Sequence, residues 1–81
     1  MLTIYGSMLC KDCVQCRQEL DAAQVPYVFL DFGEELKHLK AFLAIRDGSS
    51  LFDGARAEGG IGIPCIVRED GSVTLSWEEF L

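Results

Sequence analysis

Three cysteines stand at three-residue intervals between a strand-like segment and a helix-compatible segment. They are Cys10, Cys13 and Cys16, and the strand-like residues 2–5 precede them. The first turn of a helix carries partial positive charge and free backbone N–H groups, and both favour a thiolate over a thiol. Because the thiolate is the nucleophile in disulfide exchange, this placement indicates redox chemistry at Cys10.

The cysteine spacing determines which disulfides can form. Residues i and i+3 of a helix share a face, with Cα atoms roughly 5 Å apart, which is within the disulfide range. Cys10 with Cys13 meets this condition, and so does Cys13 with Cys16. A rise of about 9 Å separates Cys10 from Cys16, so they cannot bridge while the helix is intact. Cys13 is therefore the common partner of two alternative disulfides.

The chain length and composition predict one small domain, residues 1–81. The 81 residues are 49% hydrophobic, which is enough for a core. The chain has no apolar run long enough for a membrane span, and its N-terminus does not resemble a signal peptide. Four cysteines without such a signal are typical of reactive or metal-binding thiols, so we expect a cytoplasmic protein. We also expect a monomer.

The charge distribution argues against binding to nucleic acids. The formal net charge is −6, and the seven Lys and Arg residues form no cluster. Nucleic-acid binding requires a basic surface that neutralises phosphates, and the sequence predicts no such surface. The acidic character mainly indicates solubility.

The order of the main predicted elements is β-α-β-α-β-β-α, with a short additional helix after the second α. Strands are expected at residues 2–5, 27–30, 63–67 and 73–75, and helices at 11–24, 34–46, 51–58 and 77–81. The first helix offers Cys13, Leu20 and Ala23, with Val14, as its inner face. Ser50 is expected to cap the third helix with Asp53, and Ser76 to form a capping box with Glu79. The first βαβ unit implies parallel strands, and Asp70-Gly71 a hairpin, so the expected fold class is α/β with a mixed four-stranded sheet and flanking helices.

The chain resembles the glutaredoxins, within the thioredoxin-fold superfamily, at three places in the same order. Ile4-Tyr5 followed by Cys10-x-x-Cys13 is similar to the opening of that family. Gly62-Ile63-Pro64 is similar to its cis-proline loop, and a strand hairpin follows. The resemblance covers nearly the whole chain and implies a thioredoxin-like (glutaredoxin) fold and a thiol–disulfide oxidoreductase.

The resemblance also implies a role for each matching residue. Cys10 would be the attacking thiolate, and Cys13 the resolving thiol. Pro64 would form a cis peptide bond with Ile63, whose backbone would pair with an extended substrate segment. Lys11 and Asp12, between the cysteines, do not match the family: Lys11 would stabilise a Cys10 thiolate and Asp12 would oppose it, and Lys11 is also a candidate substrate contact. The expected substrate is a disulfide-containing protein or a low-molecular-weight thiol.

Departures from the glutaredoxin pattern concern the electron donor. Lys11-Asp12 stands between the cysteines, where the family often has Pro-Tyr, and no lysine lies shortly before Cys10. The glycine pair that follows the second hairpin strand in the family is also missing. Since these elements help to hold glutathione, we expect weak glutathione binding, with Lys11 or Arg56 as replacement contacts. We expect no tightly bound cofactor.

A second likeness points to another electron donor. Cys13-Val14-Gln15-Cys16 and Ser76-Trp77 are similar to segments of the glutaredoxin-like hydrogen donors of ribonucleotide reductase. Those proteins receive electrons from thioredoxin reductase, which makes thioredoxin reductase a candidate partner here. Alignment from Tyr5, however, puts Cys10 rather than Cys13 at the active-site position.

Two cysteines and one rival function remain open at this point. Cys16 and Cys65 are either accessory thiols or small core residues. Cys10, Cys13 and Cys16, with Cys65 as a fourth ligand, would alternatively bind zinc or an Fe–S cluster. Three ligands on one regular helix converge poorly on one ion, so the sequence favours the redox site and no metal.

Overall fold

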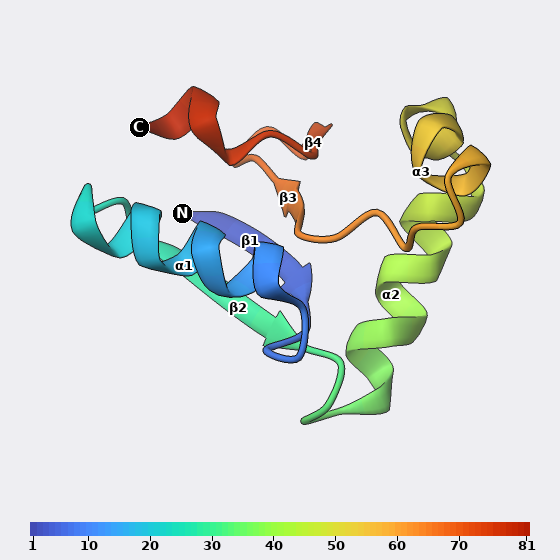
Figure 1. Ribbon diagram of the computed structural model, residues 1–81, viewed down its shortest axis with the longest axis horizontal. Coiled ribbons are helices and arrows are strands. Elements are labelled where there is room, and N and C mark those ends of the chain that lie inside the picture. Colours follow the sequence, from blue (N-terminus) through green and yellow to red (C-terminus); the bar gives the residue numbers. More distant parts are fainter.

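A four-stranded sheet forms the centre of the computed structural model, which describes residues 1–81 (Figure 1). The elements are β1 (Leu2–Gly6), α1 (Lys11–Ala22), β2 (Tyr27–Asp31), α2 (Leu36–Asp47), η1 (Ser50–Phe52), α3 (Asp53–Ala57), β3 (Cys65–Val67), β4 (Val73–Thr74) and η2 (Trp77–Phe80), where η denotes a 3₁₀ helix. The strand order is β2-β1-β3-β4. The predicted α/β class, with a mixed four-stranded sheet and helices, is confirmed.

The strand directions follow from the connections between them. β1 and β2 are parallel, as expected for strands joined by the crossover helix α1. β3 pairs antiparallel with β1, and β4 antiparallel with β3. The predicted hairpin turn is present, because the Arg68 backbone N–H donates to Ser72 O at 2.8 Å and the Gly71 N–H donates to Arg68 O at 2.9 Å.

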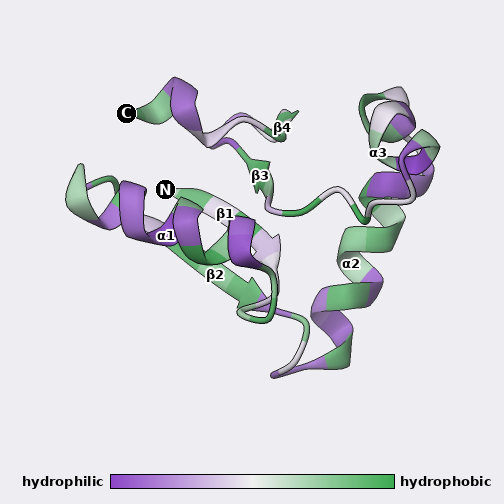
Figure 2. Ribbon diagram, in the orientation of Figure 1, coloured by the Kyte–Doolittle hydropathy of each residue, from purple (hydrophilic) through white to green (hydrophobic).

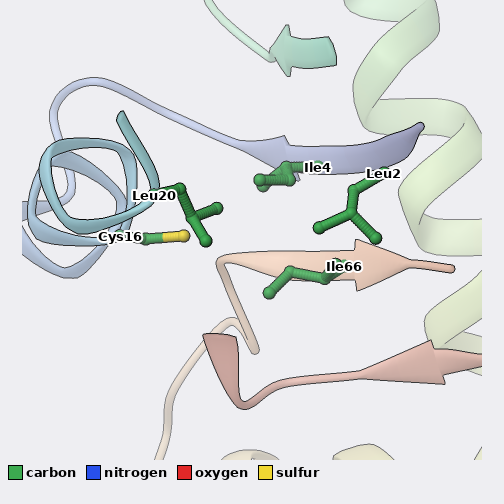
Figure 3. Close-up of a cluster of buried hydrophobic side chains, with 5 residues drawn as sticks. All are labelled: Leu2, Ile4, Cys16, Leu20 and Ile66. Carbon is green, nitrogen blue, oxygen red and sulfur yellow. The ribbon is translucent and has the colours of Figure 1, made fainter. Parts of the chain in front are cut away.

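Successive side chains of a strand point to opposite faces of the sheet, and the core accordingly consists of two clusters, one on each face. The first cluster consists of Leu2, Ile4, Cys16, Leu20 and Ile66, between the sheet and α1 (Figure 3). The second consists of Phe42, Phe52 and Cys65, where α2 and η1 meet the sheet. Neighbouring residues of β3 thus point to opposite faces. Figure 2 shows β2 and β3 as mainly hydrophobic and much of α1 as hydrophilic, in agreement with one buried face of that helix. None of the helices is long and apolar enough to cross a membrane.

The end of α1 differs from the prediction. The helix stops at Ala22, two residues before the predicted end, because Gln24 adopts a left-handed backbone with φ of 58°. The Val25 N–H then donates to Leu20 O at 2.9 Å and turns the chain towards β2. Ala23 is consequently exposed, so its predicted place on the inner face was wrong. The buried residues of α1 are Cys13, Cys16 and Leu20.

The predicted helix at 51–58 is two short elements, η1 and α3. Its predicted cap was one residue out of register. The Oγ of Ser49, rather than that of Ser50, accepts a hydrogen bond from the Leu51 N–H at 3.2 Å. Either serine fits the local pattern, and the packing of Phe52 into the second cluster selects the register.

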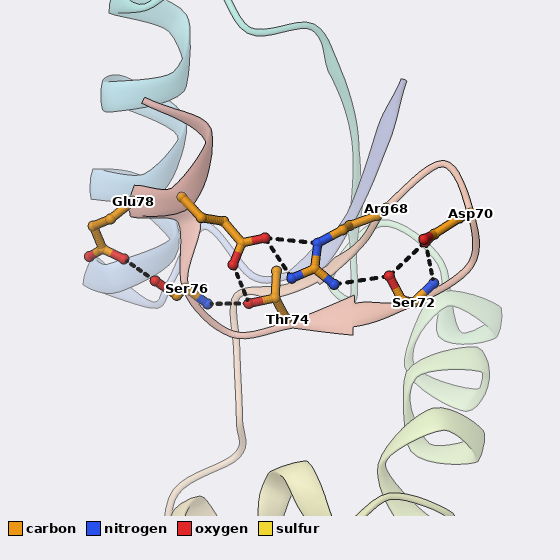
Figure 4. Close-up of polar contacts among 7 residues, drawn as sticks. Arg68, Asp70, Ser72, Thr74, Ser76 and Glu78 are labelled. Atoms are coloured by element: carbon orange, nitrogen blue, oxygen red, sulfur yellow. Dashed lines mark hydrogen bonds and ion pairs between the residues drawn. The ribbon is translucent and has the colours of Figure 1, made fainter.

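The C-terminal capping box was also predicted wrongly. The Ser76 side chain makes no capping hydrogen bond, and its hydroxyl donates instead to Glu78 at 2.7 Å. The Glu79 carboxylate accepts hydrogen bonds from Arg68 at 2.8 Å and from the Thr74 hydroxyl at 3.2 Å (Figure 4). Glu79 therefore ties η2 to the β3–β4 hairpin rather than closing the helix end.

The segment between α3 and β3 lies against the second core cluster at Gly62. This glycine has a φ of 93°, and a Cβ atom added to it would lie 2.5 Å from Cδ1 of Phe52. Both the backbone conformation and the close approach require glycine. The contact holds the chain just before Ile63 onto Phe52.

Gly62→Ala should lower the free energy of unfolding more than Gly71→Ala. Gly71 has a similar φ of 89° but has no atom within 4 Å of an added Cβ, so it is a matched control for the backbone cost alone. We expect a loss of about 1 kcal/mol for Gly71→Ala and a further 1–3 kcal/mol, roughly, for Gly62→Ala. Urea unfolding measures both. Equal losses would contradict the Phe52 contact.

Candidate functional site

Cys10 is the N-cap residue of α1. Its backbone is extended, with φ of −94° and ψ of 120°, and its carbonyl accepts from the Val14 N–H at 3.1 Å. A tight turn after β1 brings the chain to this point. The Ser7 carbonyl accepts from the Cys10 N–H at 3.1 Å, and the Ser7 Oγ accepts from the Leu9 N–H at 3.1 Å. The predicted position of Cys10 at the helix start is confirmed, and its side chain is half-buried.

Cys13 lies one turn further along α1 and is completely buried. The pKa of its thiol is raised from 9.0 to about 12, mainly because burial removes it from water; a backbone hydrogen bond from Ser7 opposes the rise, and the neighbouring Cys10 and Cys16 side chains add to it. Cys13 is therefore held as a neutral thiol next to Cys10. The pair is asymmetric, with one accessible sulfur and one protected sulfur.

A pocket of about 480 Å³ opens between the start of α1 and the segment that leads from α3 to β3. Its walls are formed by Cys10, Asp12, Ala55, Glu58, Gly59, Gly60, Ile61, Gly62 and Ile63. Two regions about fifty residues apart in sequence thus meet around the half-buried cysteine. The sheet brings them together because β1, which leads to Cys10, pairs with β3, which follows Pro64.

The peptide bond between Ile63 and Pro64 is cis, as predicted. Pro64 is buried, whereas Ile63 forms part of the pocket wall. Ile63 lies outside every helix and strand, and its backbone takes part in none of the turn and loop hydrogen bonds. Its N–H and C=O are therefore unpaired within the chain at the edge of the pocket.

Two predicted substrate contacts lie elsewhere. Lys11 is exposed and is not part of the pocket wall. Arg56 forms an ion pair with Asp53 at 3.0 Å and also donates to the Arg46 carbonyl. Neither cation is part of the pocket wall.

Cys16 and Cys65 are packed in separate clusters. Cys16 belongs to the first cluster, between α1 and the sheet, and Cys65 belongs to the second, on the other face. Burial raises the pKa of each thiol to about 11. No group of three or more His, Cys, Asp or Glu side chains is arranged to hold a metal ion. Cys16 and Cys65, two of the four ligands in the alternative zinc or Fe–S site, therefore do not lie together.

Gly6 supports the site but was not singled out from the sequence. It is the last inward position of β1, after Leu2 and Ile4, and it lies under the first turn of α1. A Cβ atom added to it would lie 2.7 Å from Cys13 Sγ and 3.2 Å from the Phe29 ring. A glycine at a strand position that faces the core is a sequence signal for such a close approach.

Comparison with known proteins identifies a relative in Haemophilus influenzae. This uncharacterized protein is 36% identical over 72 residues, which are 89% of this chain and 84% of that protein. The chain therefore belongs to the same family as the Haemophilus influenzae protein. No family model matches the chain, and no solved structure matches it.

The buried thiols should make the fold sensitive to alkaline pH. The Cys13 pKa is 9.0 in the unfolded reference and about 12 in the fold, so the unfolded chain loses this proton first. Its stabilising contribution is complete below pH 9 and is lost as the pH rises towards 12. Over that range the wild-type free energy of unfolding should fall more steeply than that of Cys13→Ala, by about 1.4 kcal/mol per pH unit. Urea unfolding under reducing conditions tests this, and parallel profiles would contradict it.

Gly6→Ala should displace the Cys13 sulfur and lower the free energy of unfolding by about 1–3 kcal/mol. The clash with Phe29 is common to any background, whereas the clash with the sulfur disappears in Cys13→Ala. Gly6→Ala should therefore lower the free energy of unfolding less in the Cys13→Ala protein than in the wild type. A double-mutant cycle should give a coupling energy of about 0.5 kcal/mol or more. Additive losses would show that the Gly6–Cys13 approach does not limit the packing of α1.

Proposed function

We propose that this protein is a thiol–disulfide oxidoreductase of the glutaredoxin type, with a thioredoxin-like fold. The observation that carries the proposal is that one pocket has both Cys10 and Ile63 in its wall. Cys10, the proposed nucleophile, stands at a helix start, and Ile63, whose backbone would receive substrate, borders the same pocket. The mixed four-stranded sheet, with helices on both faces, agrees with the fold that the resemblance implies.

The first step is attack by the Cys10 thiolate on a substrate disulfide. A bond forms between the Cys10 sulfur and one substrate sulfur, the substrate S–S bond breaks, and the other substrate sulfur leaves as a thiolate. Of the four cysteines, Cys10 alone has a half-exposed side chain, so it is the one that an incoming disulfide can reach.

The second step is resolution by Cys13. Its thiol loses a proton to solvent or to the departing thiolate, its sulfur bonds to Cys10, and the substrate is released as a second thiol. The two electrons that reduced the substrate are thereby taken from the cysteine pair. The raised pKa of Cys13, about 12, keeps this sulfur protonated in the reduced protein.

Protein disulfides are the proposed substrates. Leu9, next to Cys10, is 99% exposed, and Ile61 in the pocket wall is 54% exposed. These apolar side chains on either side of the nucleophile suit a polypeptide that covers them. The unpaired backbone of Ile63 would hydrogen-bond to an extended segment of that polypeptide, as in strand addition.

The oxidised pair needs an external electron donor. We propose a dithiol donor, such as thioredoxin reductase, in preference to glutathione. The sequence lacks the family's upstream lysine and glycine pair, and the possible replacement Arg56 is already paired with Asp53. Lys11 is likewise outside the pocket wall.

Serine variants of the two cysteines test the assignment of roles. Cys10→Ser should abolish reduction of a disulfide substrate, because the nucleophile is lost. Cys13→Ser should accumulate a mixed disulfide on Cys10, because Cys16 lies too far along α1 to resolve it. Intact-mass spectrometry after reaction distinguishes the two. Cys16→Ser is the control and should turn over as the wild type does. Trapping by Cys10→Ser instead would reverse the roles, and no adduct in any variant would contradict the proposed function.

A further inference from the structure

The pocket beside Cys10 contains two acidic residues and no basic one. Asp12 enters from the first turn of α1, and Glu58 from the end of α3. The remaining wall residues are glycine or apolar, apart from Cys10 itself. The charged side chains in the pocket wall are therefore both negative.

Neither carboxylate is used inside the protein. The ion pairs engage Glu69, Glu35, Asp53 and Glu79, and no ion pair or side-chain hydrogen bond involves Asp12 or Glu58. Their negative charges are thus not neutralised by a neighbouring side chain and remain available to a ligand.

None of the neighbouring cations forms an ion pair with either carboxylate. Arg46 donates to the Gly60 carbonyl at 3.1 Å, so it supports the pocket segment, but it is not part of the wall. Arg56 is paired with Asp53. Lys11 is exposed and also outside the wall.

A purely structural explanation covers Asp12 better than it covers Glu58. An acidic residue in the first turn of a helix interacts favourably with the helix dipole, as Asp12 does in α1. Glu58 is the C-cap residue of α3, where a negative charge is unfavourable to the dipole. Its position is of no benefit to the short helix but places a carboxylate opposite Cys10 in the pocket.

We propose that Asp12 and Glu58 make the site select disulfides that carry positive charge next to the sulfur atoms, such as a cystine flanked by Lys or Arg in a basic protein segment. This inference rests on the proposed function, because it names the substrate class of the same pocket. The carboxylates attract a cationic group as it approaches and repel an anionic one. Since both residues border open pocket, the effect weakens as salt increases.

The test compares three small disulfides that differ in charge. They are cystamine, which is cationic, bis(2-hydroxyethyl) disulfide, which is neutral, and dithiodipropionate, which is anionic. The rate constant for mixed-disulfide formation is measured with the Cys13→Ser protein by acid quenching and intact-mass spectrometry. Each constant is divided by that of the same disulfide with dithiothreitol, which removes differences in intrinsic reactivity.

At low ionic strength, the normalised constant for the cationic disulfide should exceed that for the neutral one by about threefold or more, and the anionic one should be slower by a similar factor. High salt should reduce the differences between the three normalised constants. Adding Asp12→Asn and Glu58→Gln to the Cys13→Ser protein should also reduce these differences. The ratio between disulfides is the readout, because any change that affects all three reactions equally cancels in it.

Matched control substitutions remove the same charge elsewhere. Glu34→Gln with Asp47→Asn neutralises two exposed carboxylates that are outside the pocket wall and form no ion pair. The differences between the three normalised constants should persist in this control. If they disappeared there, the net charge of the protein, and not Asp12 and Glu58, would be responsible for the selectivity. Reaction with all three disulfides at equal normalised rates would overturn the inference alone. No reaction with any disulfide, in a protein that circular dichroism shows to be folded, would overturn the proposed function together with it.

Discussion

The close approach of α1 to the end of β1 is the contact on which the rest of the site depends. It occurs at Gly6, where the missing side chain leaves room for the Cys13 sulfur. With Cys13 pressed against the strand, its thiol is buried and its pKa is raised to about 12. Cys10, one turn earlier, is then left at the helix start, where the pocket begins. One small residue in the sheet thus makes two neighbouring cysteines chemically different.

The opposite wall of the pocket depends on the second core cluster. Gly62 lies directly on the Phe52 ring, and Arg46 donates to the Gly60 carbonyl from α2. These contacts hold the glycine-rich segment in place although it has no regular secondary structure. The short η1 and α3 elements therefore connect core packing to the site, because η1 contributes Phe52 and α3 leads to Glu58. The proposed substrate preference depends on this connection.

Local sequence patterns predicted helices and strands better than they predicted caps. The strand and helix order was correct because hydrophobic periodicity and the β-formers of residues 27–30 are strong signals. The two caps failed because each pattern offered more than one partner. Ser49 and Ser50 are adjacent, and packing of Phe52 decided between them. Glu79 had a stronger partner in Arg68, which is distant in sequence and enters only through the β3–β4 hairpin.

The sequence by itself determined the α/β class, the parallel first unit, the hairpin, the position of Cys10 at a helix start and the cis bond before Pro64. These follow from short-range spacing, or from a resemblance carried by short motifs. Only the tertiary structure decided which cysteines are core residues and which groups surround Cys10. Cys16 and Cys65 lie on opposite faces of the sheet, and Glu58 enters the pocket because β1 pairs with β3. Burial and charge at a site depend on neighbours from distant parts of the chain, which no local pattern can specify.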